Sequence, residues 1–190
     1  VGESYRPRIN AFIRKQVAEG HQCFVVCPAV EENEDLGIKA ATVWAETLQR
    51  TVFPDLRIAL IHGQMKGAEK EAAMTAFARQ EADVLVATTV IEVGVDVPNA
   101  SLMVIENAER LGLAQLHQLR GRVGRGSAAS SCVLLYQGPL SMMAKSRLAT
   151  MRDTHDGFVI AEKDLELRGP GELLGTRQTG MAMFRIADLA

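Results

Sequence analysis

Short apolar runs alternate with segments of helical spacing over the first 136 residues. The runs are rich in Val, Ile or Leu and are bounded by turn-forming residues: 23–27, 57–61, 84–87, 101–106 and 132–136. Apolar runs of this length, with no polar alternation, are typical of strands buried on both faces. Their alternation with helical segments predicts right-handed crossovers over a parallel sheet. We therefore expect an α/β fold.

Two of the intervening segments carry apolar stripes at helical spacing. The first stripe contains Ile9, Phe12, Ile13 and Val17. The second contains Ala41, Trp44 and Leu48, and Pro54 stops it. Each stripe predicts an amphipathic helix that covers one face of the sheet.

The pattern changes after residue 136, where no further strand-like run appears. A helix is predicted behind a cap at Ser141, and a second over 158–167 follows the turn signal Asp156-Gly157. Residues 167–180 contain five glycines or prolines and few apolar side chains to bury. We therefore expect a loop that is held in place by contacts with other parts of the protein or with a partner. We expect two domains, the sheet over 1–138 and a helical hairpin with its tail over 139–190.

Composition indicates a soluble globular protein of the cytoplasm. The chain has 190 residues, 47% hydrophobic and 23% charged, which suffices for one core. No run approaches the roughly 18 apolar residues that cross a bilayer, so we expect no membrane partner. The cysteines are odd in number and lack metal-ligand spacing, so we interpret Cys23, Cys27 and Cys132 as buried thiols and expect no metal site.

The net charge of -2 hides an asymmetry along the chain. No Asp or Glu occurs over 111–151. Seven basic residues lie within this interval or directly beside it: Arg110, Arg120, Arg122, Arg125, Lys145, Arg147 and Arg152. A cationic region of this kind attracts phosphates through a screened, sequence-independent force. The alternative is an ordinary solvated face.

The stretch "QLHQLRGRVGRG" (115–126) concentrates this charge. Arg122 and Arg125 are three residues apart, so on a helical turn both guanidinium groups project to one side as a fork for phosphate oxygens. Gly121 and Gly124 have no side chain, so a phosphate or the backbone of a partner can approach closely. No Gly-Lys dipeptide occurs in the chain, so the phosphate-binding P-loop is absent. The sequence thus predicts half of a nucleotide site.

Two motifs carry a family resemblance. "QLRGRVGR" (118–125) resembles the sixth motif of superfamily-two helicases, and "ATTVIEVGVDVP" (87–98) resembles the fifth. The resemblance implies a second RecA-like domain, that is, a parallel sheet flanked by helices. It also implies that ATP and Mg²⁺ are bound mainly by a first motor domain outside this chain. On that reading the isolated chain is inactive.

The tail narrows the resemblance. "DGFVIAEKDLELRGPGELLGTRQTG" (156–180) is similar to the translocation segment that follows the motor in branch-migrating helicases and in transcription-repair coupling factors. Together with "VVCPAVEENE" (25–34) and "HGQMKGAEK" (62–70), it is closer to the branch-migrating helicases.

The resemblance also implies roles in the motor. Arg122 and Arg125 correspond to the arginines that reach the phosphates, and Gln118 opens their motif. Gly94 and Asp96 correspond to the fifth motif's turn and to its acid near the ribose. Asp96 could instead simply cap the following turn.

Contacts to DNA and coupling residues are implied in the same way. The resemblance assigns contacts with DNA phosphates to four residues: His62, Gly63, Thr88 and Thr89. It assigns the coupling of motor closure to duplex movement to Arg147, Arg168 and Gln178. Taken alone, Arg147 would be a surface arginine, and His62 an ordinary loop histidine.

The function implied is ATP-driven translocation on double-stranded DNA, with remodelling of stalled forks and branch migration of Holliday junctions. The implied partners are branched DNA and the wedge and first motor domains of the same protein, which would act as a monomer near the nucleoid. Two alternatives remain open. One is a translocase that acts on stalled RNA polymerase, and the other is a non-enzymatic module that binds nucleic acid through its basic region.

Overall fold

A five-stranded parallel sheet forms the centre of the molecule. The computed structural model describes residues 1–28, 34–88, 99–121, 131–154 and 157–176. The strands are β1 (Gln22–Cys27), β2 (Ile58–Ile61), β3 (Val84–Thr88), β4 (Ala100–Ile105) and β5 (Ser131–Leu134). Their order is β2-β3-β1-β4-β5, and every neighbouring pair is parallel. All five predicted strands are therefore confirmed.

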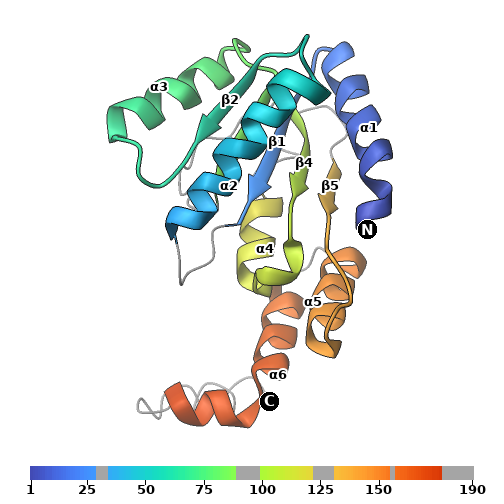
Figure 1. Cartoon of the computed structure of the whole chain (residues 1–190). Coiled ribbons are helices and arrows are strands. Elements are labelled where there is room, and N and C mark those ends of the chain that lie inside the picture. Colours follow the sequence, from blue (N-terminus) through green and yellow to red (C-terminus); the bar gives the residue numbers. More distant parts are fainter. Residues whose placement is uncertain (29–33, 89–98, 122–130, 155–156, 177–190) are drawn as a thin grey trace.

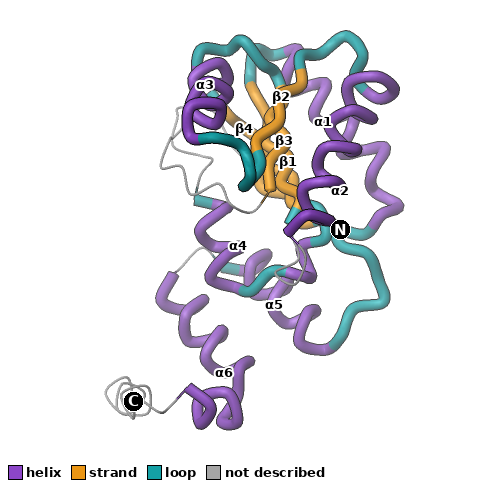
Figure 2. The backbone as a smooth tube through the Cα atoms, turned by 60° about the vertical axis from the view of Figure 1, so that its left-hand side comes forward, coloured by secondary structure: helices purple, strands orange, loops and turns teal. Residues whose placement is uncertain are grey.

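Helices cover both faces of the sheet (Figures 1 and 2). One face packs against α1 (Arg6–Ala18) and α2 (Glu34–Thr47), the other against α3 (Gly67–Ala78) and α4 (Leu113–Arg120). Successive strand side chains point to opposite faces, so Val25 joins the α1/α2 core and Phe24 the α3/α4 core. A π-helical turn over Leu48–Val52 extends α2 to the point just before Pro54. Both predicted stripes are therefore helical.

A helical hairpin follows the sheet. The hairpin consists of α5 (Met142–Asp153) and α6 (Gly157–Thr176). The Ser141 hydroxyl accepts a hydrogen bond from the Ala144 amide at 3.0 Å, which confirms the predicted cap. Buried side chains of the hairpin, Met151 and Ile160, join the α3/α4 core.

The end of the second helix differs from the prediction. We expected the helix to stop at Leu167, whereas α6 continues through Gly169-Pro170-Gly171 to Thr176. A proline inside a helix removes one backbone donor, and the helix can continue past it with a kink. Figure 1 shows α6 changing direction along its length. The predicted loop is therefore helical over 168–176.

The structure bears on two expectations from composition, the membrane-spanning segments and the cysteines. No helix among the described residues is long and apolar enough to cross a membrane. Cys23 and Cys27 are buried and Cys132 is half-buried, and all three are free thiols. Burial raises the pKa of each of them to about 12.

Candidate functional site

The carboxyl edge of the sheet has a switch point between β1 and β4. The crossover after β1 leads toward β2, whereas the connection after β4 leads to β5. In open parallel sheets, ligands bind in the crevice outside such a point. Three of the predicted elements lie at this edge: the loop after β2, the end of β3, and the connection that leads from β4 to α4.

A buried ion pair occupies the end of β4. The Arg6 guanidinium donates to both oxygens of Glu106, at 2.6 and 3.0 Å, and also bonds Glu3. It lies 4.8 Å from the centre of the Trp44 ring. The carboxylates of Glu106 and Glu3 raise the pKa of Arg6. This arginine is consequently fixed in place by acids and is not free to bind a phosphate.

Helix α4 presents the predicted Gln118 to solvent. Leu113, Leu116 and Leu119 are buried in the core, and Gln118 is exposed between them. The amide of Gly112 donates to Gln115 Oε1 at 3.1 Å, which closes the first turn. The Gln118 side chain is therefore accessible to a neighbouring domain.

The predicted phosphate-reaching arginines, Arg122 and Arg125, lie outside the described residues. So do Gly94 and Asp96 of the fifth motif. Their roles remain predictions. In the sequence, the two segments that contain them, 89–98 and 122–130, follow β3 and α4.

Arg120 has a role that the sequence did not indicate. Its Nη1 donates to the backbone oxygens of Met151, at 2.7 Å, and of Thr154, at 2.9 Å. These are carbonyls at the end of α5 and just beyond it. No local pattern could have revealed the role, because the acceptors lie 31 and 34 residues further along the chain.

Arg147 is partly buried rather than a free surface residue. Its Nη2 donates to the backbone oxygen of Glu109 at 2.9 Å. Glu109 lies in the short 3-10 helix Ala108–Arg110 between β4 and α4, and its carboxylate accepts from the Gln137 amide at 3.1 Å. Arg147 Nε and Glu109 Oε2 are buried without a hydrogen-bond partner among the described residues. Arg147 thus joins α5 to the segment that leads into α4.

The predicted DNA-contacting residues differ in accessibility. His62 is half-buried in the loop after β2, and its Nδ1 accepts from the Gln64 amide at 3.2 Å. The Gly63 carbonyl accepts from Lys70 Nζ at 3.2 Å. Thr88 ends β3 with 2% exposure, so its side chain does not face solvent. Thr89 lies outside the described residues.

The remaining predicted coupling residues belong to the tail. Arg168 lies within α6, and Gln178 lies outside the described residues. Both side chains lie outside the described part of the structure, and their roles stay predictions.

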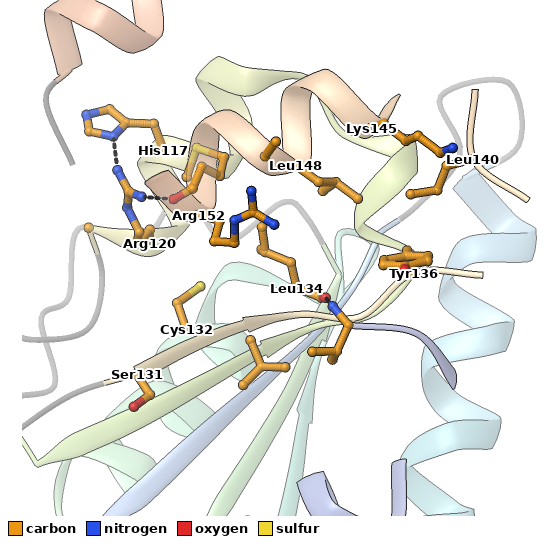
Figure 3. A pocket seen from close by; sticks show the side chains of 15 residues that line it. His117, Arg120, Ser131, Cys132, Leu134, Tyr136, Leu140, Lys145, Leu148 and Arg152 are labelled. Carbon is orange, nitrogen blue, oxygen red and sulfur yellow. Dashed lines mark hydrogen bonds between the residues drawn. The ribbon is translucent and has the colours of Figure 1, made fainter. Parts of the chain in front are cut away.

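A cavity of about 1010 Å³ opens between β5, the end of α4 and α5 (Figure 3). Its polar lining is basic and includes Arg120, Lys145 and Arg152, with His117 at its edge. None of the described residues that line it is acidic. The positive character predicted for 111–151 is thus present in the described structure on one side of the molecule.

Family comparison agrees with this geometry. The profile described as "Helicase conserved C-terminal domain" matches residues 7–127, from α1 through α4. The chain belongs to the helicase C-terminal domain family. A second profile, "ATP-dependent DNA helicase RecG, domain 3, C-terminal", matches residues 154–190 of this chain.

Individual relatives narrow the helicase family to RecG. The chain is 64% identical to ATP-dependent DNA helicase RecG of Escherichia coli strain K12 over 173 residues, which are 91% of this chain and 25% of that protein. It is 63% identical to RecG of Pasteurella multocida over all 190 residues, 27% of that protein. The resemblance predicted from the tail is therefore confirmed as a resemblance to RecG.

A solved structure supports the same assignment. The structure of RecG bound to a three-way DNA junction superposes with a TM-score of 0.76 at 45% identity, covering 90% of this chain and 22% of that one. The RecA-like fold is therefore confirmed. The chain spans about a quarter of the length of the curated relatives it matches.

Proposed function

We propose that this chain is the second motor domain and translocation tail of an ATP-dependent translocase on double-stranded DNA. The complete protein would remodel stalled forks and branch-migrate Holliday junctions. The observation that carries the proposal is that a helicase profile and a RecG-specific tail profile meet in one chain. In the described structure the parts they cover are packed together through α4 and the hairpin.

The motor chemistry would be divided between two domains. We assign ATP and Mg²⁺ mainly to a first motor domain. The lack of a Gly-Lys dipeptide, and hence of a P-loop, in the sequence supports this division. Arg122 and Arg125 would reach across the cleft, with Gln118, Gly94 and Asp96 at the same boundary.

Electrostatics gives this division its energetic reason. A guanidinium aimed at a transferring phosphoryl group contributes roughly 10³ to 10⁵ in rate. These arginines would meet the nucleotide only when the two domains close, so bound nucleotide favours the closed state. Hydrolysis would release the clamp.

Closure would move the duplex through residues at the carboxyl edge and in the hairpin. DNA phosphates would meet the loop at His62 and Gly63 and the segment at Thr88 and Thr89. Because Thr88 is buried here, we assign it a supporting role through its backbone. Arg147, Arg168 and Gln178 would relay the movement through α5 and α6.

The proposal includes a setting for the complete protein. We propose that it acts as a monomer in the bacterial cytoplasm near the nucleoid. Its wedge domain would split the arms of a fork while the motor draws in the parental duplex.

Purified full-length protein tests the proposal. We expect ATP hydrolysis stimulated by forked and four-way DNA, and regression of a model fork. Displacement of stalled RNA polymerase without fork regression would favour the transcription-repair alternative. DNA binding without ATP hydrolysis would favour the non-enzymatic alternative.

A further inference from the structure

The loop that joins β2 to α3 is closed by its own hydrogen bonds. The His62 amide donates to Met65 Sδ at 3.4 Å, and the Met65 amide donates back to the His62 carbonyl at 3.2 Å. The Gln64 amide donates to His62 Nδ1 at 3.2 Å. Residues 62–65 therefore form one turn at the carboxyl end of β2 (Figure 1).

These bonds determine which ring nitrogen of the neutral His62 side chain carries the proton. A neutral imidazole has one N–H donor and one acceptor nitrogen. Because Nδ1 accepts from the Gln64 amide, the proton lies on Nε2. None of the described residues bonds Nε2. His62 can therefore donate from Nε2 to an acceptor outside the loop, such as a phosphate oxygen.

Two side chains from opposite faces of the sheet hold this loop. Gln64 Nε2 donates to Oδ1 of Asp35, in the first turn of α2, at 2.5 Å. Lys70 Nζ, on α3, donates to the Gly63 carbonyl at 3.2 Å. Since α2 packs on one face of the sheet and α3 on the other, the loop is tied from both sides.

The charge of Asp35 opposes the binding of DNA. A carboxylate beside a loop that contacts phosphates repels them. Asp35 is exposed, and no cation among the described residues pairs with it. The contact therefore favours DNA binding only if its effect on the shape of the loop outweighs this repulsion. An acid in the first turn of a helix also suits the helix dipole, a purely structural role that the test below separates.

We propose that Asp35 is a positioning residue for the DNA-contacting loop and that it acts through Gln64. Asp35 Oδ1 holds the Gln64 side chain, the Gln64 amide orients the His62 ring, and the ring presents its Nε2 proton to a DNA phosphate. Asp35 itself does not touch DNA in this account. The inference rests on the proposed function, because the phosphate contact of His62 belongs to that proposal.

The test uses the full-length protein and forked DNA. ATP hydrolysis is followed as the DNA is titrated, which gives a maximal rate and a DNA concentration at half of that rate. Asp35→Ala removes both the negative charge and the acceptor oxygen, whereas Asp35→Asn removes the charge and keeps an acceptor oxygen. Glu46→Ala removes a carboxylate from an exposed position further along α2 and is the matched control.

We expect Asp35→Ala to raise the half-saturating DNA concentration about fivefold, as the loss of one hydrogen bond would, and to keep the maximal rate within about twofold of wild type. Asp35→Asn and Glu46→Ala should not raise that concentration. Gln64→Ala should match Asp35→Ala, and the double variant should be no weaker than either single variant, because both remove the same contact. If Asp35→Ala folds poorly, the exposed Gln64 gives the same reading.

The sign of the change decides the outcome. If the charge alone matters, Asp35→Ala and Asp35→Asn both lower the half-saturating concentration, and the inference is overturned. A fall in the maximal rate with an unchanged half-saturating concentration would indicate the purely structural role and would overturn it too. If the wild-type protein shows no DNA-stimulated hydrolysis, the proposed function itself fails, a result distinct from both.

Discussion

Arg6 and Arg120 each join segments that are distant in sequence, but they do so through different partners. Arg6 is held by the carboxylates of Glu3 and Glu106 and lies over the Trp44 ring. Arg120 is held by two neutral backbone carbonyls. The first arrangement neutralises the guanidinium, whereas the second uses its hydrogen bonds and, among the described residues, pairs its charge with no carboxylate.

The difference separates a fixed part of the molecule from a part suited to movement. The Arg6–Glu106 pair resists separation, because loss of Arg6 would leave the buried Glu106 carboxylate without its guanidinium, and loss of Glu106 would leave Arg6 with the exposed Glu3 alone. Bonds to backbone carbonyls cost less to exchange, since water can replace them at a surface. The Arg6 ion pairs therefore belong to the fixed scaffold of the motor fold. The two hydrogen bonds of Arg120 lie where the motor fold meets its hairpin, and they suit a contact that can move.

The largest effect is expected from breaking the scaffold pair. Glu106→Ala leaves the Arg6 guanidinium, whose side chain is only 20% exposed, with Glu3 alone. We expect a loss of about 2 to 3 kcal/mol in the free energy of unfolding, measured by urea denaturation. The double variant Arg6→Met, Glu106→Leu should recover much of that loss. A single variant as stable as wild type would contradict the comparison.

A smaller loss in the free energy of unfolding is expected where Arg120 joins α4 to the hairpin. Arg120→Gln leaves the carbonyls of Met151 and Thr154 without their cationic donor, so we expect about 1 to 2 kcal/mol of destabilisation. Amide exchange at the end of α5 should accelerate more than exchange in the sheet. Arg152→Gln is the matched control and should leave both quantities unchanged. Uniform acceleration across the sheet would show that Arg120 belongs to the scaffold.

The smallest effect is a change in thiol reactivity. The pKa of Cys27 is raised to about 12 by burial first and by the charge of Glu106 second. Glu106→Gln removes that charge, so the pKa of Cys27 should fall and its alkylation by iodoacetamide should accelerate. The pKa of Cys23 depends on burial and Asp83 instead, so Cys23 is an internal control. An equal change at both thiols, measured by mass spectrometry, would indicate general loosening instead.

The same thiols predict a pH dependence. Their pKa values are raised in the folded protein to about 12 from 9.0, so the unfolded chain loses thiol protons first as the pH rises. The stability they contribute is fully present below about pH 9 and declines between about pH 9 and 12. Replacement of all three by alanine should flatten that decline in urea titrations.

The sheet was predictable because its signal is local. Each apolar run, such as 84–87, is itself the strand, and turn-forming residues mark its ends. The cap at Ser141 was predictable for the same reason. The end of α6 was not, because Gly169-Pro170-Gly171 has low helix propensity, and neighbouring turns overrode that preference.

The site was predictable only as far as motifs reach. Gln118 could be identified from its motif, and the structure shows it exposed on α4. The bonds of Arg120 and Arg147 to backbone carbonyls had no sequence signature, since every residue offers such a carbonyl. Their partners follow only from the packing of the hairpin on α4.

The central claim is that this chain supplies arginines to an ATP site completed by another domain. The most direct measurement is the DNA-stimulated ATPase rate of the full-length protein carrying Arg122→Lys, with fork binding followed in parallel. The account predicts a fall of about 10³ or more in the rate, because lysine lacks the planar fork, with DNA affinity nearly unchanged. An ATPase rate equal to that of wild type would contradict it.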